Sequence, residues 1–303
     1  MSNEEIKTEI ISQKLLALNA VMVGLVVVMV FAIYGQMNRS TKQVAEVREA
    51  VTSNAFDNLQ LEGRSAYVFD IQQNKVLFKK NEFVQLPLAS LTKLMTALVA
   101  TEMYPSDLHV TIKKEFLSTE GDSGLLVGET WKLKDLLDFS LVVSSNDGIR
   151  AVASIKSRED FISKMNARAK ELGLKQTYFV NENGLDDGES SGGYGSAIDV
   201  EKMMQYILEN QPEIIEATKY QTINIKSGSK IHTAKNTDIV LNQIPNLIAS
   251  KTGYTDMAGG NLVVAFDASI GRPIIVVVLG SSEQGRFSDV EKLVGASLEY
   301  ISE

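Results

Sequence analysis

The sequence predicts an α+β domain that follows an N-terminal membrane anchor. Strand-like segments lie near both ends of residues 62–303, and mostly helical segments lie between them. Strands at both ends of a domain most simply meet in one sheet, against which the intervening helices pack. Ahead of this region stands a run of 20 residues without a charged side chain, residues 15–34. We therefore divide the chain into a tail with its anchor (1–35), a stalk or linker (36–61) and one domain (62–303).

The apolar run, LLALNAVMVGLVVVMVFAIY, is long enough to cross a membrane. About 20 helical residues span the roughly 30 Å hydrocarbon core of a bilayer, whereas the apolar part of a secretory signal needs only about 7 to 15. The residues that follow, YGQMNRSTK, contain no A-x-A-like cleavage site, so we expect an uncleaved single-pass helix. Lysines and arginines flank the run on both sides, so their count does not fix its orientation.

The predicted stalk, residues 36–61, is polar, mixed in charge and free of proline. Val44, Val47 and Val51 recur at helical spacing, and some 25 helical residues would extend about 35 to 40 Å. Three valines are too few to predict a coiled coil. A helical stalk and a solvated linker with one apolar stripe therefore both stay open.

The domain itself begins with a predicted hairpin and a buried helix. Residues 65–70 (SAYVFD) and 75–78 (KVLF) flank the turn-rich IQQN, which is the pattern of a β-hairpin. Pro87 then precedes SLTKLMTALVATEMY, which is apolar nearly all round and predicts a central buried helix. We expect further helices over 133–143, 148–155, 159–172 and 198–210, strands over 249–255, 261–266 and 273–280, and a closing helix over 287–301.

The scarcity of cysteine and histidine limits the kinds of catalytic and metal sites that the chain can form. The chain has no cysteine and only two histidines, His109 and His232, which we expect at the surface because both have polar neighbours. These counts exclude disulfides, thiolate nucleophiles, cysteine-based or three-histidine metal sites and the HExxH arrangement. We therefore predict no metal and no cofactor. A net charge of −8 argues against a nucleic-acid partner.

One cluster suited to nucleophilic chemistry is Ser90-Leu91-Thr92-Lys93, at the start of the predicted central helix. A spacing of three places the Ser90 hydroxyl and the Lys93 amine on one helical face. A helix N-terminus favours developing negative charge, which suits a serine that loses a proton and attacks a carbonyl. In isolation, however, the cluster is better explained as a helix cap beside a polar-face lysine.

Two more clusters favour a catalytic over a structural interpretation of Ser90 and Lys93. Residues 144–146 (Ser-Ser-Asn) fall at a helix junction, where alone they would be an N-cap, and residues 251–253 (Lys-Thr-Gly) lie in a strand-like segment. The preceding PNLIAS does not supply the phosphate-loop pattern GxxxxGK[ST]. Together the clusters follow the order S-x-x-K, S-x-N and K-T-G, 54 and 107 residues apart. A closely similar set occurs in penicillin-binding proteins and class A β-lactamases.

From Ser65 to Leu298 the sequence resembles the D-alanyl-D-alanine carboxypeptidase family of low-molecular-mass penicillin-binding proteins. The agreement extends to PLASLTKLMTALVATE, TYFVNENGLDD, NTDIVLNQIPNLIASKTGYTDMAGGNLV and PIIVVVLG. The resemblance implies a five-stranded antiparallel sheet flanked by helices, with the active-site serine beneath the strand that carries K-T-G. It implies a serine carboxypeptidase of the cell wall that removes the terminal D-Ala from peptidoglycan stem peptides and is acylated by β-lactams. Because peptidoglycan lies outside the bacterial cytoplasmic membrane, the domain would lie there too.

The resemblance also implies roles for the first two motifs. Ser90 would be the acylated nucleophile, Lys93 the base that takes its proton, and Ser144 the relay to the departing amine. Burial and the charge of Lys251 would both lower the pKa of Lys93, which must be neutral to act. Asn146 would hydrogen-bond the peptide amide of the substrate.

The resemblance implies that the third motif binds the C-terminal end of the substrate. Lys251 and Thr252, in the K-T-G motif completed by Gly253, would bind the terminal carboxylate of the stem peptide. The backbone N–H groups of Ser90 and Tyr254 would form the oxyanion hole.

Three alternatives stay open beside this interpretation. A DD-endopeptidase that cuts cross-links would use the same residues. A class A-like β-lactamase needs a deacylating glutamate in an E-x-x-L-N context, but Asp238 is the wrong acid in the wrong place, and Glu182 lacks that context. A catalytically silent scaffold is disfavoured by the complete motifs. We expect the N-terminal span to replace the β-domain and C-terminal amphipathic helix that tether many carboxypeptidases of the family.

Two other features have plain interpretations. The run SSGGYGS, residues 190–196, is preceded by no predicted strand, so we expect a flexible loop near the entrance of the site and not a phosphate nest. Trp131 is expected to pack in the core.

Overall fold

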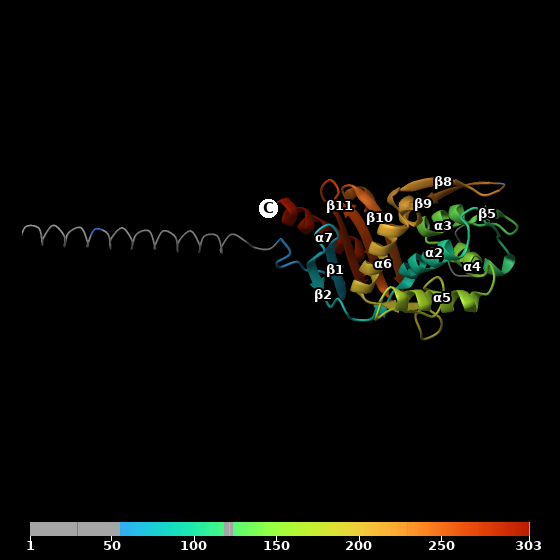
Figure 1. Cartoon of the computed structure of the whole chain (residues 1–303), viewed down its shortest axis with the longest axis horizontal. Helices are drawn as coiled ribbons and strands as arrows, with labels where there is room; N and C mark the ends of the chain where they lie inside the picture. Colours follow the sequence, from blue (N-terminus) through green and yellow to red (C-terminus); the bar gives the residue numbers. More distant parts are fainter. Residues whose placement is uncertain (1–28, 30–54, 118–120, 122–123, 229, 303) are drawn as a thin grey trace, which may run out of the picture. The chain divides into compact units, whose positions relative to one another are not determined.

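Figure 1 shows the computed structural model of the chain, which describes Met29 and residues 55–117, 121, 124–228 and 230–302. Apart from Met29, the predicted tail, the span 15–34 and the stalk up to residue 54 lie outside the described residues. Within the part that is described, no helix is long and apolar enough to cross a membrane. The chain divides into two units after Asn54, and the fold below is that of the unit beginning at Ala55.

A five-stranded antiparallel sheet forms the centre of this unit, with the strand order β10-β11-β12-β1-β2. Its strands are β1 (Ser65–Asp70), β2 (Lys75–Lys80), β10 (Leu247–Thr255), β11 (Gly259–Asp267) and β12 (Pro273–Ser281). The register that pairs β1 with β12 sets Ser65 opposite Leu279 and Asp70 opposite Ile274. Strands from the two ends of the domain thus meet in one sheet, which confirms the predicted architecture.

Alternating side chains of the sheet face two separate apolar layers. Val276 and Val278 of β12 pack in the layer that includes Phe287 and Leu293 of α7 (Gly285–Ser302), whereas Val277 faces the larger core on the other side. This follows from the two-residue period of a strand, and it explains why PIIVVVLG is apolar without interruption. Figure 1 shows α7 on one side of the sheet and the other helices gathered on the opposite side.

The helices of the larger layer occupy the middle of the domain, as predicted. They are α2 (Thr92–Met103), α3 (Leu133–Val142), α4 (Asn146–Ala153), α5 (Arg158–Glu171) and α6 (Ala197–Asn210). Every residue of α2 from Thr92 to Ala100 is buried, so its largely apolar sequence does indicate a central helix. Trp131 is fully buried in the same core.

Short elements complete the structure. The strands are β3 (Leu86–Pro87), β4 (His109–Thr111), β5 (Thr130–Lys132), β6 (Tyr178–Phe179), β7 (Gly193–Gly195), β8 (Thr222–Lys226) and β9 (Ile231–Lys235). The 3-10 helices are η1 (Ala89–Leu91), η2 (Lys114–Phe116), η3 (Pro212–Ile214), η4 (Glu216–Lys219) and η5 (Leu241–Gln243).

The glycine-rich run 190–196 is not the loop that its composition predicts. It contains β7, which pairs with both β3 and β6. A Cβ atom added at Gly193 would lie 2.6 Å from Thr92 Oγ1, so the glycine lets this strand approach α2 closely.

The prediction of a surface position is wrong for His232. Its ring is buried and tilted against Trp131, with centroids 4.7 Å apart, and its Nε2 lies 2.9 Å from Oε1 of the buried Glu129. On β9 the inward positions alternate, so His232 and Ala234 face the core while their neighbours face solvent. His109 is exposed, as expected.

Candidate active site

Ser90 and Lys93 meet where the short helix η1 runs into α2. Ser90 lies within η1, and Lys93 Nζ lies 2.6 Å from Ser90 Oγ. The preceding residue, Ala89, has φ +48°, in the left-handed region that costs a residue with a side chain about 1–2 kcal/mol. Such strained residues concentrate at functional sites, because the surrounding fold must hold them in place.

The environment of Lys93 disfavours its charged form. Burial lowers the pKa of Lys93 well below its ordinary value, and the positive charge of Lys251 lowers it further. Its Nζ donates a hydrogen bond to the carbonyl oxygen of Asn183 at 2.9 Å. A neutral amine has an N–H for this carbonyl and a lone pair for the proton of Ser90. Lys93 is therefore suited to act as a general base.

Ser144 stands in a strained turn between α3 and α4, with φ +59°. Its Oγ accepts a hydrogen bond of 2.9 Å from Lys251 Nζ. The neighbouring Ser145 caps α4, since its side chain accepts from the N–H of Gly148. The two serines of this turn therefore have different contacts: Ser145 caps α4, and Ser144 binds Lys251. Asn146, the first residue of α4, is buried.

Lys251 and Thr252 lie on β10, almost wholly buried. Burial lowers the pKa of Lys251 to about 7, and the nearby guanidinium of Arg286 contributes in the same direction. The amine also donates to the carbonyl oxygen of Thr252 at 2.7 Å, and Thr252 Oγ1 lies 2.6 Å from Thr237 Oγ1. Consecutive residues of β10 thus supply an amine and a hydroxyl, and both kinds of group can donate to a carboxylate.

Gly253 lets β10 pass close to the nucleophile. A Cβ atom at this position would lie 3.2 Å from the backbone nitrogen of Ser90 and 3.0 Å from the carbonyl oxygen of Leu88. The strand therefore runs beside the Ser90 backbone, as the resemblance implies. Tyr254 follows directly, partly exposed and paired with Gly260 of β11.

Three groups of the site could not be recognised from the sequence. Arg286 of α7 donates from Nη1 to the carbonyl oxygen of Gly253 at 2.7 Å, and Thr237 contacts Thr252. Neither residue belongs to a motif with recognisable spacing. The third group is the Asn183 carbonyl, which any residue type could supply, so no side chain signals it.

The two carboxylates considered for a β-lactamase are both engaged elsewhere. Asp238 is buried, and its carboxylate accepts from the Ser250 hydroxyl and the Val240 N–H. Glu182 is fully buried, and its Oε2 accepts a hydrogen bond of 2.7 Å from Arg158 Nε. Both carboxylates are thus buried, and each is held by at least one hydrogen bond to a group outside the three motifs.

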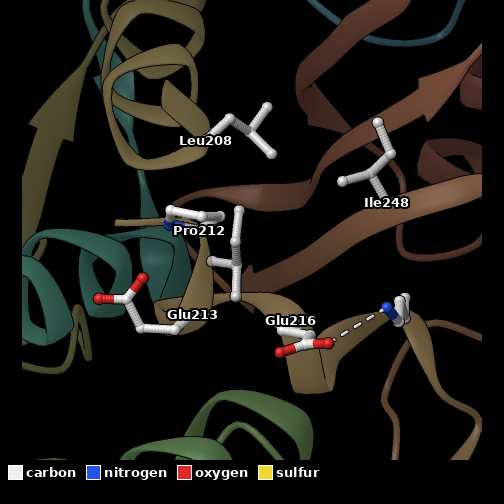
Figure 2. Close-up of a pocket in the computed structure, with 7 residues that line it drawn as sticks. Leu208, Pro212, Glu213, Glu216 and Ile248 are labelled. Carbon is white, nitrogen blue, oxygen red and sulfur yellow. Dashed lines mark ion pairs between the residues drawn. The ribbon is translucent and has the colours of Figure 1, made fainter. Parts of the chain in front are cut away.

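A cavity of about 360 Å³ opens elsewhere, between the end of α6, η3, η4 and β10 (Figure 2). It is lined by Leu208, Pro212, Glu213, Ile215, Glu216, Lys219 and Ile248. Its Glu216 and Lys219 form an ion pair of 3.5 Å. No residue of the three motifs lines this cavity.

Comparison with known proteins places the chain in a family. The family model described as D-alanyl-D-alanine carboxypeptidase matches residues 50–283. The chain belongs to this family. D-alanyl-D-alanine carboxypeptidase DacF of Bacillus subtilis is 31% identical over 77% of this chain, which spans only 61% of the length of DacF.

Two further proteins are similar to this chain over more of their own length. The D-alanyl-D-alanine endopeptidase of Pseudomonas aeruginosa is 31% identical over 77% of this chain and 76% of that protein. The crystal structure of penicillin-binding protein D2 from Listeria monocytogenes in its ampicillin-bound form matches with a TM-score of 0.71 and 30% identity, over 79% of this chain and 98% of that one. The α+β fold with a five-stranded antiparallel sheet is thus the fold of this family.

Proposed function

We propose that the chain is a serine D-alanyl-D-alanine carboxypeptidase that removes the terminal D-Ala from peptidoglycan stem peptides. The observation that carries this proposal is the pair of contacts from Lys93 Nζ to Ser90 Oγ and from Lys251 Nζ to Ser144 Oγ. In them a buried lysine, whose pKa burial lowers, contacts Ser90, and a second lysine contacts Ser144.

The first step is acylation of Ser90. Its Oγ attacks the carbonyl carbon of the bond between the two D-Ala residues, and Lys93 takes the hydroxyl proton. The negative charge that develops on the carbonyl oxygen is stabilised by the backbone N–H groups of Ser90 and Tyr254. Collapse of the tetrahedral intermediate breaks the peptide bond, and Ser144 relays the proton from Lys93 to the departing amine.

Hydrolysis of the resulting ester completes the cycle. A water molecule attacks the acyl carbon while Lys93 takes one of its protons, and the proton then returns to Ser90 Oγ as the ester bond breaks. A β-lactam would acylate Ser90 in the same way, with the opened ring still attached.

Substrate recognition rests on the other motif residues. Lys251 supplies charge and Thr252 a hydroxyl donor to the terminal carboxylate of the stem peptide, while Asn146 bonds its peptide amide. Arg286 holds the strand at Gly253, next to this carboxylate site.

Release of D-Ala from a purified pentapeptide by the full chain in detergent tests the proposal. We expect release by the natural chain and none by Ser90→Ala. Absence of release by the natural chain would contradict it.

A second candidate function is cleavage of peptidoglycan cross-links. The similarity to the P. aeruginosa endopeptidase, which extends over 76% of that protein, favours it. Mass spectrometry of purified muropeptides decides between the two: carboxypeptidase action shortens pentapeptides by one residue, whereas endopeptidase action converts dimers to monomers.

We also propose that residues 15–34 anchor the chain in the bacterial cytoplasmic membrane, with the catalytic unit on the outer side. The uncharged 20-residue run supports the anchor, and the location of peptidoglycan supports the orientation. Protease added to intact spheroplasts should digest the catalytic unit. Its protection would contradict the orientation.

A further inference from the structure

A buried carboxylate lies behind the catalytic lysine and is held by an arginine. Glu182 has no exposed side-chain surface, and its Oε2 accepts a hydrogen bond of 2.7 Å from Nε of Arg158, whose side chain is 31% exposed. Its other oxygen, Oε1, has no hydrogen-bond partner among the residues that the structure describes. A buried charge with one cation beside it depends strongly on that cation.

The backbone that carries Glu182 packs directly on α2. The Glu182 carbonyl oxygen accepts a hydrogen bond from Thr96 Oγ1, and the next carbonyl, that of Asn183, accepts from Lys93 Nζ at 2.9 Å. At Gly184 the approach is so close that an added Cβ atom would lie 1.9 Å from the Ala89 carbonyl oxygen. The segment that positions the Lys93 amine therefore also carries Glu182, the partner of Arg158.

The groups around Lys93 shift its pKa in opposite directions. Burial and Lys251, which faces it from β10, lower its pKa, whereas Glu182, on the segment packed against α2, raises it. Arg158, at the start of α5, stands behind Glu182 and offsets the charge of the carboxylate. A carboxylate without its arginine would favour the protonated and inactive form of Lys93.

We propose that the Arg158–Glu182 ion pair holds residues 181–185 against α2 and offsets the field of a buried carboxylate at Lys93. Both residues are positioning residues for the general base, although neither touches the substrate. The inference rests on the proposed function insofar as Lys93 is the base that activates Ser90.

Two substitutions separate this role from a merely structural one. Arg158→Gln and Glu182→Gln break the same ion pair, so loss of rigidity alone would change the site in the same way in both. Their effects on local charge are opposite. Arg158→Gln removes a positive charge from the surroundings of Lys93, and Glu182→Gln removes a negative one.

The rate of acylation of the full chain by a fluorescent penicillin is measured between pH 4 and 9 for each variant. We expect the acid limb to move to higher pH in Arg158→Gln and to lower pH in Glu182→Gln, each by about half a pH unit, a roughly threefold change in rate on the acid side. The double variant should return toward the natural chain. Arg168→Gln is the matched control, because Arg168 also lies on α5 and pairs with Glu102 at 2.8 Å, and its limb should not move.

A direct titration of Lys93 keeps the test independent of activity. NMR of the lysine side chains, assigned with Lys93→Met, should show the Lys93 transition moving in the same opposite directions. Shifts of the same sign in both variants, or no shift in either, would overturn the inference. If the natural chain releases no D-Ala but the transitions still move oppositely, the proposed function fails and the positioning role stands.

Discussion

Lys251 Nζ lies 2.9 Å from Ser144 Oγ, and this contact joins the K-T-G strand to the turn between α3 and α4. The two residues are 107 positions apart in the sequence. Each alone has a commonplace explanation, a strand lysine and a helix-junction serine. Their contact, beside the pair of Ser90 and Lys93, brings the three motifs into one site.

The two lysines predict a bell-shaped dependence of kcat/KM on pH. Lys93 must be neutral, so activity falls as pH drops through its lowered pKa; Lys251 must be charged, so activity falls as pH rises through about 7. In kcat the alkaline limb should move upward, because a bound carboxylate stabilises the charged form of Lys251. Steady-state D-Ala release across pH checks this, and an alkaline limb at the same pH in both profiles would argue against carboxylate binding by Lys251.

Replacing Lys251 should reduce the preference for a free C-terminal carboxylate. A charged hydrogen bond contributes about 1.5–3 kcal/mol, so Lys251→Gln should lower the ratio of kcat/KM for an acid-terminated over an amide-terminated peptide by roughly 10- to 100-fold. Lys219→Gln, which removes a lysine from the cavity of Figure 2, should leave the ratio unchanged. An unchanged ratio in Lys251→Gln would exclude Lys251 from carboxylate binding.

Gly184 is expected to tolerate no side chain. It has φ +83°, and an added Cβ atom would lie 1.9 Å from the Ala89 carbonyl oxygen, so Gly184→Ala should both slow acylation and destabilise the fold. Gly173 has φ +69° with nothing within 4 Å of an added Cβ atom, and Gly173→Ala should cost only the left-handed strain of about 1–2 kcal/mol. Denaturant unfolding and penicillin labelling compare them; equal losses in both variants would show that the contact with Ala89 has no effect.

The buried pair of His232 and Glu129 should stabilise the fold. Removing its imidazole leaves a buried carboxylate without this partner and opens a space beside Trp131, so His232→Ala should lower the free energy of unfolding by about 3 kcal/mol. His109→Ala, at an exposed position, should change it by less than about 0.5 kcal/mol. Denaturant unfolding measures both, and a neutral His232→Ala would contradict the pairing.

The main elements of the fold could be predicted because their patterns are local. A strand such as β12 is apolar from Pro273 to Leu279, and α2 is apolar on most of its surface, so both are recognisable without tertiary information. The short strands β3, β6 and β7 escape prediction because two or three residues carry no measurable period. Their pairing depends instead on contacts such as that of Gly193 with Thr92.

The functional residues also differ in how far the sequence predicts them. Ser90, Lys93 and the other motif residues stand out only through the order of the three motifs, because a spacing of three alone is better explained as a helix cap. His232 could not be placed, since its partner Glu129 is 103 residues away and its neighbours are polar. The Asn183 carbonyl could not be predicted because it is a backbone group. Arg286 could not be predicted because it bonds the backbone of Gly253, which lies on another element, 33 residues away in the sequence.

The central claim is that Ser90 is the acylated nucleophile, and peptide mass spectrometry after incubation with benzylpenicillin tests it most directly. We predict that the full chain gains the mass of one penicillin, that the adduct lies on the peptide containing Ser90, and that Ser90→Ala gains none. An adduct on any other residue, or labelling of Ser90→Ala, would contradict the account.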